Sequence, residues 1–188
     1  YTYVNSVHNY QSILCLQPRN SAKQICNNFK LEIEPKPAKV YSRTDYFGNI
    51  QHYFSLHESH KSLKVTVTSE VEVLNNAIQL FNTITCEEAR LKFKTDIALK
   101  TEVLQYQLPS QYISWDEEIT AFAETCLKPD ISLFEAVLDI KKKIYTEFQF
   151  KSGSTNVNTP LKTVLKERKG VCQDFSHLAI ASLRSVGI

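Results

Sequence analysis

The sequence of 188 residues has no methionine, only 4 glycines and 6 prolines, and a net charge of only +2. Because not even position 1 is methionine, we expect that Tyr1 is not the start of the gene product, which leaves room for a removed targeting segment. No run approaches the roughly 20 apolar residues of a membrane-spanning helix. The small charge and the lack of a Lys/Arg cluster argue against a nucleic-acid partner. The remaining composition, 43% hydrophobic and 22% charged, is typical of a globular chain with one or two domains.

The sequence also lacks closely spaced pairs of cysteines. The number of cysteines is odd and none stands in a CxxC spacing, so a four-cysteine zinc site is not supported. This pattern favours a reduced, intracellular chain, and we expect a cytoplasmic protein without metal or cofactor. The cysteines are Cys15, Cys26, Cys86, Cys126 and Cys172.

Three histidines lie close together in the first half of the sequence and raise the question of a metal site. Strand alternation sends His52 and His57 to opposite faces, and His60 falls in an expected turn. We therefore predict surface histidines rather than metal ligands.

The first 80 residues carry the two-residue alternation of β-strands. In "FKLEIEP" the apolar residues are Phe29, Leu31 and Ile33, and "LKVTVTSEVEV" alternates in the same way. Residues 50–65 are expected to form a hairpin. Several short strands at this spacing predict an antiparallel β-sandwich over residues 1–80.

From residue 114 onward the period changes to that of helices. Two segments begin with a serine followed three residues later by a glutamate, which predicts capping boxes at Ser114 and Ser132. "TPLKTVLKERKG" predicts a further helix with Thr159 as its cap. Residues 81–188 therefore form a second, helical domain, and the fold class of the chain is α+β.

The final segment, "CQDFSHLAIASLRSVG", predicts a helix that begins at Cys172 and stops at Gly187. It is apolar nearly all round, so we expect it at the centre of its domain with Cys172 facing inward. Unpaired N–H groups and the positive end of the dipole at a helix start favour an anion, which makes Cys172 a candidate nucleophile. A structural thiol would suit the same position, and the residues alone leave both interpretations open.

Nothing near Cys172 in the sequence can serve as its base. Helical geometry places His177 about 140° and Asp174 about 200° around the axis from the thiol. We expect Asp174 to have a structural role toward the helix dipole. The backbone N–H of Gln173 in the first turn is a candidate oxyanion-hole donor.

The run "GVCQDFSH", followed by "LRSVGI", resembles the nucleophile segment of bacterial transglutaminase-like proteins, which are predicted cysteine proteases. "LQPR", "DYFGN" and "LKVTVTSEVEV" are similar to the β-rich domain that precedes the core in these proteins, and "LPSQYI" to the connecting region. The resemblance implies a papain-like transglutaminase core with a Cys-His-Asp triad in which Cys172 is the nucleophile. It also implies acyl transfer from an amide.

In that family the histidine and the aspartate follow the cysteine, on strands of a sheet. This sequence ends at Ile188, so we expect a fragment that holds the helical front part of the core and lacks triad-dependent activity. The implied substrate is a protein or peptide, with no nucleic acid or membrane partner. The surface that the missing sheet would cover predicts association between copies. The alternative is a non-catalytic binding or scaffold module that keeps the fold.

Overall fold

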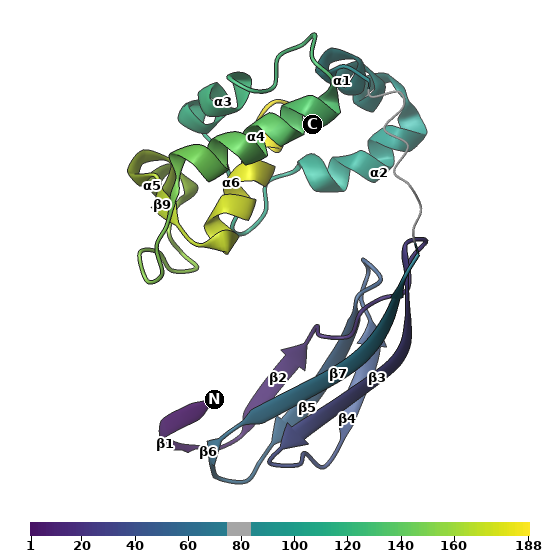
Figure 1. Ribbon diagram of the computed structural model, residues 1–188, viewed down its shortest axis with the longest axis vertical. Coiled ribbons are helices and arrows are strands. Elements are labelled where there is room, and N and C mark those ends of the chain that lie inside the picture. The colour runs from purple at the N-terminus through teal and green to yellow at the C-terminus, as the bar shows by residue number, and fades with distance from the viewer. Residues whose placement is uncertain (75–83) are drawn as a thin grey trace. The chain divides into compact units, whose positions relative to one another are not determined.

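The computed structural model describes residues 1–74 and 84–188, which divide into two compact units, Tyr1–Gln79 and Leu80–Ile188 (Figure 1). The predicted domain boundary near residue 80 lies outside the described residues. The first unit is built from antiparallel strands and the second mainly from helices, so the predicted mixed α and β character is confirmed. Within the described residues, no helix combines the length and the apolar character that crossing a membrane requires.

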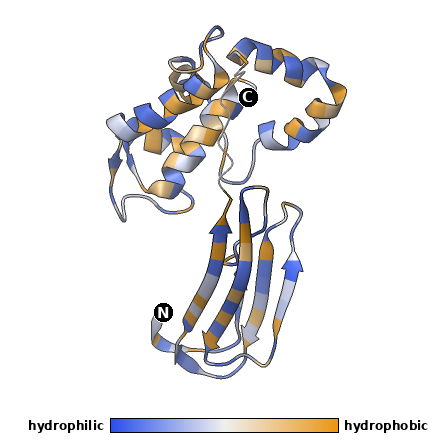
Figure 2. Ribbon diagram, turned by 45° about the vertical axis from the view of Figure 1, so that its right-hand side comes forward, coloured by the Kyte–Doolittle hydropathy of each residue, from blue (hydrophilic) through white to orange (hydrophobic). Residues whose placement is uncertain are grey.

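Antiparallel pairing organises the N-terminal unit into three groups of strands, with the orders β2-β5-β4, β3-β7 and β1-β6. Apolar and polar residues alternate along them in Figure 2, as the sequence pattern predicts. The longest pair joins β3 and β7, with Leu31 opposite Val67. The strands are β1 (Thr2–Val7), β2 (Tyr10–Leu14), β3 (Gln24–Glu34), β4 (Val40–Thr44), β5 (Ile50–Leu56), β6 (His60–Ser62) and β7 (Lys64–Val73).

The predicted hairpin over residues 50–65 is wrong. β5 pairs with β2 and β4, whereas β6 pairs with β1. Alternation marks a strand but does not identify its partner, which depends on contacts between residues far apart in the sequence. One such contact is the core that Phe54 and Leu56 of β5 share with Ile33 of β3.

The three clustered histidines of this unit, His52, His57 and His60, differ in how far they are buried. His57 is exposed, and His52 is half-buried and stacked on Phe29 with the ring centroids 5.2 Å apart. His60 is buried, with its ring edge-on to the rings of Tyr3 and Tyr10. The prediction of a surface histidine is therefore wrong for His60, because the residue begins strand β6 instead of lying in a turn.

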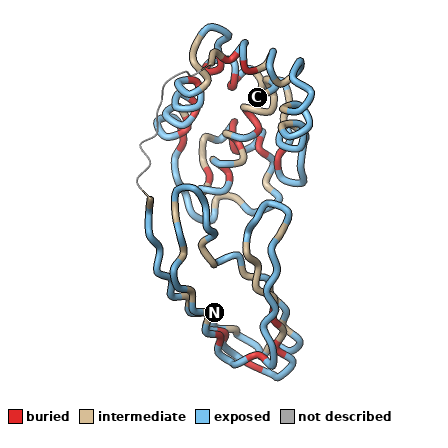
Figure 3. Tube along the Cα trace, turned by 90° about the vertical axis from the view of Figure 1, so that its right-hand side faces the viewer, coloured by how far each residue is buried: buried red, intermediate tan, exposed pale blue. Residues whose placement is uncertain are grey.

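The C-terminal unit packs its helices around α6. Buried residues of α3, α4, α5 and α6 belong to one continuous core, and Figure 3 marks the buried positions in red. The elements are α1 (Cys86–Thr95), α2 (Ile97–Gln107), α3 (Glu117–Glu124), α4 (Leu133–Glu147), α5 (Leu161–Glu167) and α6 (Cys172–Ser185), with a short parallel pair, β8 (Gln149–Phe150) and β9 (Lys169–Gly170).

Side-chain caps start most of these helices. Ser132 is confirmed as the N-cap of α4, because its hydroxyl accepts from the N–H of Glu135 and donates to the carboxylate of the same residue. The return bond of a capping box, from the backbone N–H of Ser132 to that carboxylate, is not among the hydrogen bonds of the described residues. The capping box predicted at Ser114 is wrong: Asp116 is the N-cap of α3. At α5 the N-cap is Pro160, one residue after the expected Thr159.

Helix α6 is buried on one side only. Leu178, Ala181 and Ser182 have no exposed surface, whereas Cys172 and Ser176 are exposed and Ile180 is 37% exposed. We call these three exposed residues, which recur every four positions, the open stripe. The prediction that Cys172 faces inward is thus wrong, because apolar composition alone does not show how many sides of a helix are covered.

The predicted stop at Gly187 is confirmed. Gly187 has a φ of 79° and donates its N–H to the carbonyl of Arg184, and Ile188 donates to Leu183. These two bonds satisfy carbonyls that the end of α6 leaves without helical partners.

We expect the Leu178→Ala substitution to lower the free energy of unfolding of the C-terminal unit by about 2–5 kcal/mol, because it opens a cavity in a filled core. Ile180→Ala, on the same helix, should cost about 1 kcal/mol or less. Fluorescence of Trp115, the single tryptophan, reports this unit in denaturant titrations because it packs against the same core. Equal losses for the two variants would contradict the one-sided burial of α6.

Candidate active site

Cys172 is the first residue of α6 and is exposed to solvent. Within the described part of the chain, no residue forms a hydrogen bond with its thiol. The N-cap is Val171, whose side chain cannot accept a hydrogen bond. In α1, α2, α3 and α4, by contrast, the N-cap side chain accepts from the first turn.

Because α6 has no side-chain cap, N–H groups of its first turn lack hydrogen-bond acceptors. Among the described residues, none accepts a hydrogen bond from the backbone N–H of Cys172 or of Gln173. Such free donors, at the positive end of the helix dipole, can stabilise a negative charge beside the thiol. The structure thus places the predicted nucleophile and the predicted oxyanion donor side by side at an open helix start.

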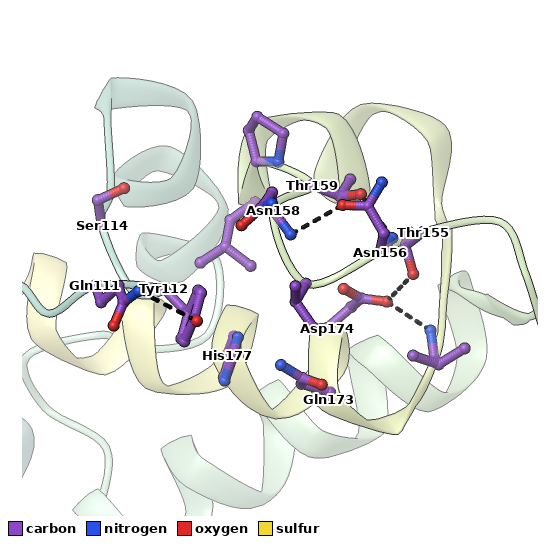
Figure 4. A pocket seen from close by; sticks show the side chains of 14 residues that line it. Gln111, Tyr112, Ser114, Thr155, Asn156, Asn158, Thr159, Gln173, Asp174 and His177 are labelled. Atoms are coloured by element: carbon purple, nitrogen blue, oxygen red, sulfur yellow. Dashed lines mark hydrogen bonds between the residues drawn. The ribbon is translucent and has the colours of Figure 1, made fainter. Parts of the chain in front are cut away.

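Asp174 holds this helix start in place. Its Oδ2 atom accepts the N–H of Val171 at 2.8 Å and the hydroxyl of Thr155 at 2.6 Å (Figure 4). We call these two hydrogen bonds the Asp174 clamp. Asp174 is 7% exposed, so the clamp lies almost entirely out of water. The clamp joins α6 to the loop between β8 and α5, a tertiary contact beyond the local role predicted for this carboxylate.

Gly170 allows the clamp to form. A Cβ atom at this position would lie 2.9 Å from Oδ2 and 3.0 Å from Cβ of Asp174, closer than side chains tolerate. Gly170 also accepts the N–H of Lys151 at 2.9 Å, within the β8–β9 pairing. Close packing against Asp174 therefore accounts for the glycine two residues before Cys172.

Two arginines secure the opposite end of α6. Arg90 of α1 donates from Nε to the carbonyl of Val186 at 2.8 Å, and Arg184 donates to the carbonyl of Leu108 at 2.8 Å. The helix is consequently fixed at its C-terminal end while its N-terminal donors remain open.

A polar pocket of about 450 Å³ lies beside the first turns of α6. Asp174 and His177 line it, and the ring of His177 stacks in parallel on that of Tyr112, with the centroids 6.1 Å apart. Cys172 does not line the pocket. This agrees with the helical geometry that excluded His177 as the base for the thiol.

Part of this site has no signal in the sequence pattern. Thr155 stands in a loop, and Tyr112 lies far from α6 in the chain, so neither follows from periodicity. A glycine four residues before a first-turn aspartate was a usable hint that the two approach each other.

Family models match both units. Residues 1–72 match the bacterial transglutaminase-like N-terminal region, and residues 118–188 match the transglutaminase-like superfamily. Uncharacterized proteins of Mycobacterium bovis and Mycobacterium tuberculosis are 35% identical over 176 residues, which cover 92% of this chain and 55% of theirs. One of Mycobacterium leprae is 30% identical over 173 residues, covering 92% of this chain and 59% of its own. The chain thus spans little more than half the length of these relatives.

A similar fold occurs in a solved structure from Cytophaga hutchinsonii, of a protein proposed to be a cysteine protease. The TM-score is 0.69 with 19% sequence identity, and the match covers 97% of this chain and 60% of the other. At this identity the comparison shows the fold alone.

We expect Gly170→Ala to destabilise the C-terminal unit by about 1–3 kcal/mol, because the added methyl group displaces Asp174. In a double-mutant cycle with Asp174→Ala, the two losses should be less than additive by about 0.5–3 kcal/mol, since the second change removes the carboxylate that the methyl group meets. Denaturant titration of the four proteins measures the coupling. Strict additivity would show that Gly170 and Asp174 do not depend on each other.

Brief treatment of the folded protein with iodoacetamide should modify Cys172 and the exposed Cys15. Cys86 and Cys126 should react slowly because they are 0% and 7% exposed, and burial also raises the pKa of the Cys86 thiol. Mass spectrometry of the digested protein gives the extent at each site. A protected Cys172 would contradict the exposed position at the start of α6.

Proposed function

Because this chain belongs to the transglutaminase-like superfamily, we propose that it is part of a cysteine protease or amidase whose nucleophile is Cys172. The observation that carries the proposal is the exposed thiol at an uncapped helix start, next to free backbone donors. Arrangements of this kind are suited to a reaction in which a thiolate attacks and an oxyanion forms. No other exposed cysteine of the described residues stands at a helix start.

The proposed reaction proceeds through an acyl-enzyme. The Cys172 thiolate adds to the carbonyl carbon of a peptide or side-chain amide, and the N–H of Gln173 donates to the oxygen that becomes negative. The C–N bond then breaks, the amine leaves with a proton, and a thioester remains. Water attacks the thioester, releasing a carboxylic acid and the free thiol.

The base is proposed to come from outside these 188 residues. His177 faces the pocket and not Cys172, and the mycobacterial relatives are considerably longer than the match. A histidine and an aspartate on strands of the complete core would take the roles of base and orienting group.

The remaining parts of the chain have proposed roles that follow from this one. The strands of the N-terminal unit would close as a sandwich around Phe54 and control how large substrates approach. The open stripe of α6 would be covered by the rest of the core, or by a second copy when that part is absent. Neither role calls for nucleic acid or a membrane.

The test uses the full-length protein with Cys172→Ala, and with Cys15→Ala as the matched control because Cys15 is the other exposed cysteine. Release of fluorescent peptides from labelled casein measures hydrolysis. Hydroxamate formation from a glutamine-containing peptide and hydroxylamine detects the acyl-enzyme. We expect Cys172→Ala to lower both rates at least about a thousandfold and Cys15→Ala to leave them unchanged.

Two outcomes would count against the proposal. Activity that survives in Cys172→Ala would exclude this nucleophile. A folded wild-type protein that is inactive in both assays would favour the alternative, a binding or scaffold module that has kept the fold without the chemistry.

A further inference from the structure

The pocket beside α6 contains a carboxylate oxygen that the clamp does not use. Oδ2 of Asp174 accepts both clamp hydrogen bonds, and none of the described residues donates a hydrogen bond to Oδ1. Figure 4 shows the carboxyl group with Oδ2 toward Thr155 and the other oxygen on the opposite side. Asp174 lines the pocket although it is 7% exposed. The pocket therefore contains an acceptor oxygen that no described residue uses. This oxygen is not fully buried, so a ligand in the pocket can reach it.

No charged side chain of the described residues pairs with this acceptor. Asp174 is the one carboxylate among the residues that line the pocket, and no lysine or arginine lines it. Its clamp partners are a neutral N–H and a neutral hydroxyl, and no described cation forms an ion pair with it. Asp174 lies in the first turn of α6, where the helix dipole favours a carboxylate. A cationic ligand in the pocket would add a charged hydrogen-bond donor at Oδ1.

Aromatic rings form another wall of the same pocket. Tyr112 and His177 lie parallel within 3°, and both line the cavity. Aromatic faces attract organic cations and cover the carbon atoms attached to them. A carboxylate next to aromatic rings is a combination suited to alkylammonium groups. The volume of about 450 Å³ is within the range of small-molecule sites.

Other ligand classes fit less well. An anion would be repelled by Asp174, which no lysine or arginine of the lining offsets. A divalent metal ion needs several ligating side chains, and the described residues contain no group of three or more histidine, cysteine, aspartate or glutamate side chains that could hold one.

We propose that this pocket binds a small organic ammonium ion, whose N–H groups donate to Oδ1 of Asp174 while its carbon atoms lie against Tyr112 and His177. Cys172 does not line the pocket, although its neighbours Val171 and Gln173 do. The proposal does not depend on the catalytic role of that thiol. Binding would take place next to the loop that the clamp attaches to α6.

The probe is butylammonium chloride, added to the full-length protein at an ionic strength held constant with KCl. 1-Butanol and sodium butyrate are matched probes of nearly the same shape with no charge and with a negative charge. Saturation-transfer NMR of each probe gives its Kd. We expect butylammonium to bind at least about tenfold more tightly than either analogue.

Asp174→Asn separates the pocket from the clamp. The amide oxygen can still accept from Val171 and Thr155, whereas its NH₂ group replaces the free oxygen with a donor. We therefore expect a protein of nearly unchanged Tm whose affinity for butylammonium falls at least about tenfold. Asp139→Asn, which alters an exposed carboxylate on α4, should leave the affinity unchanged.

Tyr112→Ala provides a second variant that leaves the clamp intact and should weaken binding severalfold. Equal binding of butylammonium and 1-butanol would overturn the proposal, since it would show that charge is not recognised. Unchanged affinity in a folded Asp174→Asn protein would overturn it too, and so would failure of butylammonium to bind the wild type.

Discussion

The two hydrogen bonds that Oδ2 of Asp174 accepts determine the geometry of the candidate site. They connect the start of α6 to the loop carrying Thr155, and they do so almost out of water, where a broken bond is costly. The carboxylate approaches so closely that a Cβ atom at position 170 would force it to shift. It takes the N–H of Val171, which precedes the helix, and leaves the N–H groups of Cys172 and Gln173 unused. One carboxylate thus positions the helix start without occupying the donors that the proposed chemistry needs.

Local features of this chain were readable from its sequence, whereas contacts between distant residues were not. Alternation located β3 and β7, the serine and glutamate spacing at Ser132 located the start of α4, and Gly187 marked the end of α6. These features depend on neighbours within a few residues. The hairpin over 50–65 failed because strand partners are chosen by packing across the whole unit.

The same distinction explains the predictions about individual side chains. Cys172 was expected to face inward because its helix is apolar, and His60 was expected outside because it was placed in a turn. Both errors arise from judging burial by local pattern, whereas burial depends on which elements cover a position. The resemblance to a family pointed to Cys172 as a candidate nucleophile but did not predict the residues that surround it. The structure supplied Thr155, Gly170 and the pocket, which no periodicity indicates.

The stability of α6 comes from its buried side and its C-terminal end. Its N-terminus can therefore do without a side-chain cap, and its first-turn N–H groups stay unpaired. A serine or aspartate at the N-cap in place of Val171 would typically stabilise a helix by about 1 kcal/mol, but its oxygen would occupy first-turn donors. That loss is offset by the filled core around Leu178 and by the bonds that Arg90 and Gly187 make at the far end. Helices α1 to α4, which carry no candidate chemistry at their starts, have side-chain caps. Helix α5, whose N-cap is Pro160, lacks a side-chain cap as well, so an uncapped start does not by itself indicate chemistry. At α6 the uncapped start leaves free the donors that the proposed reaction would use.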